Sequence, residues 1–179
     1  MTGVGPRLAA LALIFGLALV AGSALAQSSG AGGHDSTLPI EITADSLEVQ
    51  REQSLAIFRG DVLAVQSDLH LRAQTLVVHY QENDAHDEGT TISQIDASGD
   101  VFVSSPSETA QGDVGVYDVK AGVIDLTGAV VLTRGENVVK GNHLVMDLNT
   151  GYSRVEGAVG ADGERVKSIF IPEQKDEGN

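Results

Sequence analysis

The chain has no cysteine, no tryptophan and few basic side chains. Without cysteine it can form no disulfide and offers no thiol nucleophile, so its fold must depend on a core and on backbone hydrogen bonds. Because 11 Lys and Arg stand against 25 Asp and Glu, the net charge of -14 argues against nucleic acid as a partner. Aromatic residues make up only 4% of the 179 residues, so the hydrophobic 42% is mostly aliphatic and predicts a core of Val, Leu and Ile.

A long apolar run stands at the N-terminus. It extends from Leu8 to Ala26, Arg7 is the only charged residue before it, and it closes with Ala24-Leu25-Ala26. This layout is typical of a secretory signal peptide with its cleavage site, so residues 1–26 are predicted to be removed and the protein to be exported. Cleavage would change the net charge to -15, because Arg7 is lost. An uncleaved membrane anchor is the alternative, since the run is nearly long enough to span a bilayer.

The remaining chain divides by composition into three parts. Residues 27–37 are rich in Gly and Ser and predict a flexible lead-in. Residues 173–179 follow Pro172 and predict a disordered tail. A single domain is expected over residues 38–172, which is long enough to bury a core without disulfides.

Small residues recur in this domain at a fixed interval. Two series of landmarks are spaced by 29 residues, apart from one insertion of ten residues at 81–90. Internal repeats of this length indicate repeated supersecondary units. The first series is Ala44, Ala73, Gly112 and Gly141, and the second is Gly60, Gly99, Gly128 and Gly157.

Each repeat unit has the pattern of β-strands. Apolar and polar residues alternate around the landmarks, which indicates strands with one buried face, and no helical periodicity follows the N-terminal run. A glycine in mid-strand marks a bend or bulge, so long bent strands predict an all-β, strongly curved antiparallel sheet that folds over as a jelly roll or sandwich. A solenoid is the alternative. Residues that favour tight hairpin turns follow the first series of landmarks by ten positions, at Ser54, Asn83, Gly122 and Gly151.

The sequence contains no recognisable catalytic motif. There is no Gly-x-Ser-x-Gly elbow, and the glycine-rich positions open no helix that could hold a phosphate. One segment, 79–89, gathers side chains of the types that bind metals, but its spacing matches no metal motif and predicts a solvated turn. We therefore predict a protein that is not an enzyme, and keep a metal-dependent hydrolase as a weak alternative. The residues concerned are His79, Glu82, Asp84, His86, Asp87 and Glu88.

Four segments together resemble a known family. In sequence, order and spacing they are similar to the OstA-like (organic-solvent-tolerance) family of periplasmic lipopolysaccharide-transport proteins, over essentially all of residues 38–172. The run from Ile124 to Leu148 is the most specific part. The segments are LPIEITADSLEV (38–49), FRGDVLAVQSDLHLRAQTLVV (58–78), IDLTGAVVLTRGENVVKGNHLVMDL (124–148) and RVKSIFIP (165–172).

The resemblance implies a twisted antiparallel β-jelly roll, an open and V-shaped clasp of two sheets, with the acyl chains of lipopolysaccharide (LPS) held in its apolar groove. It implies a periplasmic carrier that bridges the inner and outer membranes, with no cofactor and no metal. Its partners would be LPS, an inner-membrane LPS-export complex, an outer-membrane LPS-assembly protein and further copies of itself, joined head to tail. From the apolar strand positions, the predicted groove-facing set is Leu76, Val78, Tyr117, Leu126, Val130, Leu144 and Met146.

Two other functions stay open at this point. The first is an inner-membrane-anchored LPS-transport component of the same fold, which would retain residues 1–26. The second is a structural β-solenoid or adhesin on the cell surface. An intact N-terminal segment in the mature protein would favour the first, and labelling from outside the cell would favour the second.

Overall fold

The structure, a computed structural model, describes residues 34–82, 90–158 and 164–172. The predicted signal peptide, the predicted C-terminal tail and most of the acidic insertion lie outside these ranges. Within the described ranges, no helix is long and apolar enough to cross a membrane. The elements are β1 (Glu41–Thr43), β2 (Ser46–Gln50), a 3-10 turn η1 (Arg51–Gln53), β3 (Leu55–Gln66), β4 (Leu69–Glu82), β5 (Thr90–Ser104), β6 (Thr109–Asp118), β7 (Val123–Arg134), β8 (Asn137–Asp147), β9 (Tyr152–Glu156) and β10 (Lys167–Ile169).

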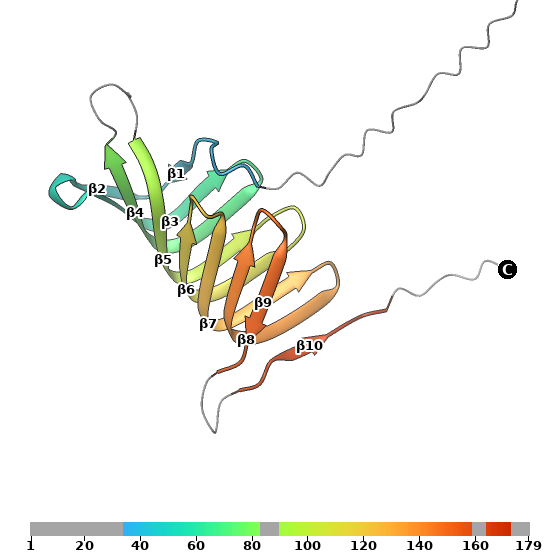
Figure 1. Cartoon of the computed structure of the whole chain (residues 1–179). Coiled ribbons are helices and arrows are strands. Elements are labelled where there is room, and N and C mark those ends of the chain that lie inside the picture. The colour runs from blue at the N-terminus through green and yellow to red at the C-terminus, as the bar shows by residue number, and fades with distance from the viewer. Residues whose placement is uncertain (1–33, 83–89, 159–163, 173–179) are drawn as a thin grey trace, which may run out of the picture. The chain divides into compact units, whose positions relative to one another are not determined.

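The strands form one open antiparallel sheet (Figure 1). Strands β3 to β8 follow one another in chain order, each paired with its neighbour in sequence. Both β1 and β2 pair with β3, and both β9 and β10 pair with β8. The all-β, antiparallel prediction is confirmed, and the sheet is not closed on itself.

The second series of landmarks forms a row of β-bulges. At Gly60, Gly99 and Gly128 the backbone φ angles are 84°, 79° and 103°, in the region that favours glycine. The register with β4 shifts at Gly60, and the register with both neighbouring strands shifts at Gly99 and at Gly128. A bulge bends its strand and increases the local twist, so one row of bulges bends the whole sheet along a line. The predicted bend at the repeated glycines is therefore confirmed for these three copies.

The bend divides the sheet into two halves. Half-sheet A contains β2, β9 and the parts of β3 to β8 on the same side of the bulges, and half-sheet B contains β1, β10 and the other parts. We call the bulge row the hinge and the opposite ends of the half-sheets the mouth. This division explains why β3 and β8 each carry two partners along one edge.

The hinge alternates large and small side chains. Val62 lies opposite Ala73, Val101 opposite Gly112, and Val130 opposite Gly141. All three valines are buried, so the first landmark series supplies the small residues next to which they pack. A methyl group at Gly141 would lie 2.4 Å from Val155 Cγ1, so this row requires the small residue.

Three predicted turns adopt the expected backbone conformation. Ser54, Gly122 and Gly151 have φ angles of 54°, 66° and 70°. Gly122 and Gly151 each end a turn between two antiparallel strands, and Ser54 lies between the 3-10 turn η1 and β3. A residue with left-handed backbone conformation fits at each of these places. The fourth predicted turn residue, Asn83, lies outside the described residues.

Candidate functional site

The seven residues predicted to face a groove all lie on the buried face of the sheet. Leu76 and Val78 come from β4, Tyr117 from β6, Leu126 and Val130 from β7, and Leu144 and Met146 from β8. None exposes more than 3% of its surface. They are brought together with other aliphatic side chains in one core, in which they pack against one another.

Six of the seven form two continuous rows across half-sheet A. One row runs through Val78, Ile95, Tyr117, Ile124 and Met146, which are successive cross-strand partners. The next row runs through Leu76, Ala97, Gly115, Leu126 and Leu144. Both rows cross from β4 to β8, so the interior presents an unbroken apolar surface along the sheet.

Half-sheet B contributes as many buried apolar residues to the interior as half-sheet A does. Val130 is the only one of them in the predicted site. The missed residues have the same alternation of apolar and polar positions, so this signal could have found them. They are buried to a similar extent and include Val62, Ala64, Leu71, Val101, Val103, Ala110 and Leu132.

Two polar clusters lie at the mouth, and the first joins it to the N-terminal segment. The Tyr117 hydroxyl on half-sheet A donates to Gln66 Oε1 on half-sheet B at 2.8 Å. His34 Nε2 lies 2.7 Å from the same hydroxyl, and the His34 N–H donates to Leu148 O. Gln66 Nε2 donates to the carbonyl oxygens of Ser36 and Leu38 at 3.0 and 2.9 Å. Residues 34–37, the described part of the predicted lead-in, are thus tied to both half-sheets.

The Tyr117 hydroxyl stays protonated and can donate this hydrogen bond. Burial raises the pKa of Tyr117 well above its ordinary value, and the Asp118 carboxylate raises it further. A tyrosine that buries its ring and hydrogen bonds its hydroxyl at the edge of a core is a common arrangement.

The second polar cluster is built on a buried carboxylate. Glu108 precedes β6, its side chain is 5% exposed, and its Oε2 accepts from Arg134 Nε at 3.1 Å and Nη2 at 2.7 Å. Its Oε1 accepts from the Ser153 hydroxyl at 2.9 Å, and Arg134 Nη2 also donates to Gly151 O at 3.2 Å. Glu108 and Arg134 belong to half-sheet B, whereas Ser153 and Gly151 belong to half-sheet A. Like the first, this cluster bridges the mouth.

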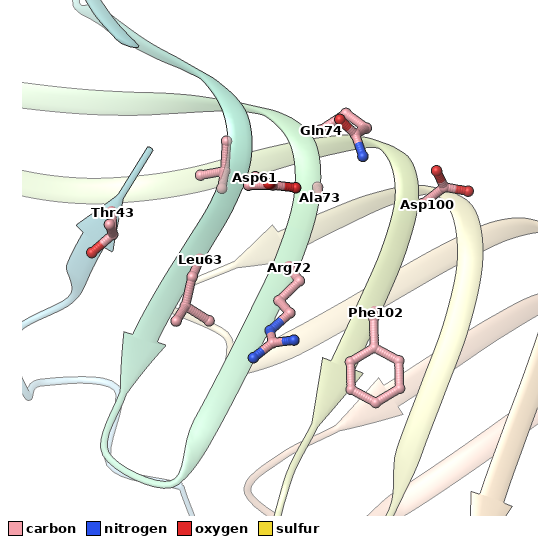
Figure 2. A pocket seen from close by; sticks show the side chains of 9 residues that line it. Thr43, Asp61, Leu63, Arg72, Ala73, Gln74, Asp100 and Phe102 are labelled. Atoms are coloured by element: carbon pink, nitrogen blue, oxygen red, sulfur yellow. The ribbon is translucent and has the colours of Figure 1, made fainter. Parts of the chain in front are cut away.

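A hollow also lies on the other face of the sheet, next to the hinge. Its volume is about 680 Å³, and Leu63, Arg72 and Phe102 project beside it with Asp61 and Asp100 at the bend (Figure 2). These three side chains alternate along their strands with buried residues, which places them on the outer face. None of the seven predicted residues lines this hollow, although Val62 and Ala73 of the hinge do.

The acidic cluster considered for a metal is only partly described. His79 lies in β4, and its Nε2 is 2.7 Å from Asp96 Oδ2 on β5. Among the described residues, no three His, Asp or Glu side chains come together in a way that could hold a metal ion. Asp84, His86, Asp87 and Glu88 lie outside those residues.

A second histidine on the outer face takes part in a small charged network. His143 Nε2 lies 2.8 Å from Asp125 Oδ2, and its Nδ1 lies 3.2 Å from Glu156 Oε2. The hydrogen bond with Asp125, and then that with Glu156, raises the pKa of His143. The contact with His143, followed by the charge of Arg154, lowers the pKa of Glu156.

This network predicts a pH dependence of stability. The raised pKa of His143 stabilises the fold fully below the ordinary imidazole pKa of about 6.5, and this contribution is lost as the pH rises through the folded-state pKa. The lowered pKa of Glu156 has the opposite sign, so its contribution is lost in acid. In urea unfolding at about pH 6, His143→Gln should cost roughly a few tenths of a kcal/mol, because the imidazole is partly solvent-exposed. The cost should shrink at about pH 8.5, and a cost that stays constant would contradict the assignment.

Comparisons with known proteins agree with this architecture. Residues 41–152 match the family described as LptA/(LptD N-terminal domain) LPS transport protein. An uncharacterized protein of Rhizobium meliloti (strain 1021) is 34% identical over 175 residues, which cover 93% of this chain and 92% of that protein. The lipopolysaccharide export system protein LptH of Pseudomonas aeruginosa is 36% identical over 73 residues, or 41% of this chain and 40% of LptH.

A solved structure has the same fold. The crystal structure of LptH, described as the LptA homologous periplasmic component of the lipopolysaccharide transport device of Pseudomonas aeruginosa, matches with a TM-score of 0.66. The match covers 78% of this chain and 99% of that chain at 21% sequence identity. At this identity the likeness concerns the fold alone, and it confirms the predicted twisted, open β-jelly roll.

Proposed function

The chain belongs to the LptA and LptD N-terminal domain family of LPS transport proteins, and from that premise we propose that it is a periplasmic carrier that holds LPS acyl chains between its two half-sheets. The carrier is not an enzyme in this proposal. It takes LPS from an inner-membrane export complex and passes it to an outer-membrane assembly protein. The predicted signal peptide supports the periplasmic location, because it would export the mature chain.

The unbroken apolar interior is the observation that carries the proposal. Its two rows in half-sheet A cross five strands, and the Tyr117 hydroxyl at the mouth is the one polar side-chain group in them; half-sheet B faces them with Val, Ala and Leu. Enclosing an acyl chain of about 12 carbons in such a surface gains on the order of 9 kcal/mol, at roughly 0.8 kcal/mol per CH₂. Partial enclosure therefore suffices for binding, and it suits a carrier that must release its load.

The charge of the chain limits which part of LPS is held. Removal of Arg7 with the predicted signal peptide changes the net charge from -14 to -15, and this charge repels the phosphates of the LPS head group at long range. We therefore place the head group in solvent, screened by divalent cations, with only the acyl chains inside. Aliphatic side chains bind an acyl chain without fixing its orientation, whereas a polar pocket would fix it.

The two edges of the sheet support head-to-tail assembly. At one edge Leu47 and Val49 of β2 are 56% and 52% exposed, and at the other Ile169 and Phe170 are 63% and 69% exposed. Edge strands with free backbone groups invite pairing with a strand of another molecule. Because the two edges differ, such pairing is head to tail and does not close, which joins successive interiors into a longer conduit.

A photo-crosslinking residue placed at position 76, 117 or 146 tests the proposal. Each position is buried in the interior, so a photoreactive side chain there should form an adduct with LPS in living cells. The same residue at position 114 is the matched control, because Val114 is 46% exposed on the outer face and should give none. Absence of adducts at all three interior positions would refute the groove assignment.

A further inference from the structure

The two polar clusters at the mouth differ in polarity from the rest of the interior. In the described part of the chain, Gln66 and Glu108 are the only polar residues among those that are almost fully buried. One belongs to each cluster, and both lie at the end of half-sheet B that is farthest from the hinge. All the other strongly buried side chains between the half-sheets are apolar, apart from the hydroxyl of Tyr117.

Both clusters connect the two half-sheets directly. In the first, which we call the tyrosine clasp, the bond from Tyr117 to Gln66 crosses the mouth, and residues 34–38 lie along it. In the second, the carboxylate clasp, Glu108 is held by Ser153 from the opposite half-sheet, and Arg134 reaches Gly151 O. The half-sheets are thus joined covalently through their strands at the hinge and by directional hydrogen bonds at the mouth.

When the half-sheets separate at the mouth, the hydrogen bonds there respond differently from the apolar contacts. When the mouth opens, each clasp group exchanges its protein partner for water, so most of the bond energy is recovered. Separation exposes the apolar side chains to water at a cost in free energy, and an acyl chain between the half-sheets would cover them again. Opening at the mouth therefore costs the exposure of apolar surface more than the loss of the clasp bonds, an entering acyl chain offsets that exposure, and the strands stay intact at the hinge.

We propose that the tyrosine clasp and the carboxylate clasp form a latch, which holds the half-sheets together at the mouth and sets how readily an acyl chain passes between them. The inference rests on the proposed function, because it assigns the route by which a lipid chain reaches the interior. The interior residues are packed against each other with the latch closed, so opening of the mouth makes the room that the chain occupies.

The latch is tested without lipid through an introduced thiol. The chain has no cysteine, so a single reporter reacts alone with a maleimide. Ala110→Cys places the thiol at the mouth, and Ala73→Cys places it at the hinge; both alanines are buried and close to cysteine in size. Tyr117→Phe removes one hydroxyl from the tyrosine clasp, and Glu108→Gln removes the charge of the carboxylate clasp while keeping its shape.

We expect each clasp variant to raise the labelling rate at the mouth by about tenfold, which corresponds to one net hydrogen bond. Labelling at the hinge should change much less, with the β-sheet circular dichroism retained. Tyr152→Phe and Arg154→Gln are the controls, because these side chains are exposed and belong to neither clasp. No increase at the mouth, or an equal increase at mouth and hinge, would overturn the latch, since an equal increase reports general loosening.

Lipid binding is measured separately on the full chain with purified LPS. If the latch is correct, the clasp variants should take up LPS faster than the wild type, by a factor similar to the gain in labelling. Faster labelling with no LPS bound by any variant would leave the latch standing and refute the proposed function. LPS bound by the wild type, with labelling unchanged in both clasp variants, would refute the latch alone.

Discussion

Replacing Gly128 with alanine is expected to lower the free energy of unfolding by about 3 kcal/mol. The φ angle of 103° at this bulge lies in a region that an L side chain rarely adopts, and strain there costs roughly 1 to 2 kcal/mol. The added methyl would also lie 2.1 Å from Asp113 Oδ2 and displace that carboxylate. Asp113 would then lose its hydrogen bond from Ala129 N, worth about 1 kcal/mol. Urea unfolding of the purified protein measures the loss.

The control for this substitution is Gly135→Ala. Gly135 has a φ angle of 58°, and no atom lies within 4 Å of the position that its methyl would take. Its expected cost is therefore about 1 kcal/mol, which is the preference for glycine in such a turn. Equal costs at the two positions would show that the bulge at Gly128 carries no special strain, and that the bend of the sheet does not depend on it.

Replacing Leu126 with alanine is expected to cost about 4 kcal/mol of stability, near the top of the range for such a change. Leu126 is fully buried, and its side chain lies over Gly115: a methyl at Gly115 would be 2.7 Å from Leu126 Cδ2. Because the facing residue is glycine, no neighbouring side chain at that position can move into the space that the truncation leaves. A cavity that the surroundings cannot fill makes the loss large.

The pairing of Leu126 with Gly115 allows a sharper test than the single variant. Gly115→Ala alone should be destabilising, because its methyl overlaps with the leucine, but in Leu126→Ala it should recover about 1 kcal/mol by refilling the cavity. Val114→Ala is the surface control, since Val114 is 46% exposed and should lose less than about 0.5 kcal/mol. Additive costs of the two interior substitutions would contradict this packing arrangement.

The architecture could be predicted well because it depends on local rules. Alternation along each strand fixes which face is buried, and glycine at one position in each repeat marks the bulge. The role of the first series was less accessible, since Ala73, Gly112 and Gly141 gain meaning only from the valines opposite them. The residue after each landmark is polar, at positions 45, 74, 113 and 142, and at Asp45, Gln74 and Asp113 it lies against a bulge glycine. This regularity was visible in the sequence as well.

The candidate site was predictable in part. The seven predicted residues lie on the interior face, but whether they contact lipid stays a prediction. The clasps could not have been foreseen, because their partners are far apart in the chain: Tyr117 is 83 residues from His34 and 51 from Gln66. A Gly/Ser-rich lead-in predicts flexibility, and only the folded arrangement brings His34 and Ser36 to the mouth. A polar residue at an inward-facing strand position, such as Gln66, is a signal that the sequence does contain.

Because each odd-numbered strand from β3 to β7 carries its own bulge, every hairpin is a complete module of the interior. A hairpin contains one bend, one valine at the hinge and one small residue opposite it, and it needs neither edge of the sheet. Two strands widen a sheet by about 10 Å, so duplication of one 29-residue unit would lengthen the apolar interior by that amount. The edges, and with them whatever the molecule joins at either end, would be unchanged. The length of a single molecule can therefore be changed in discrete steps by duplicating a hairpin, while the two edge strands keep their sequences.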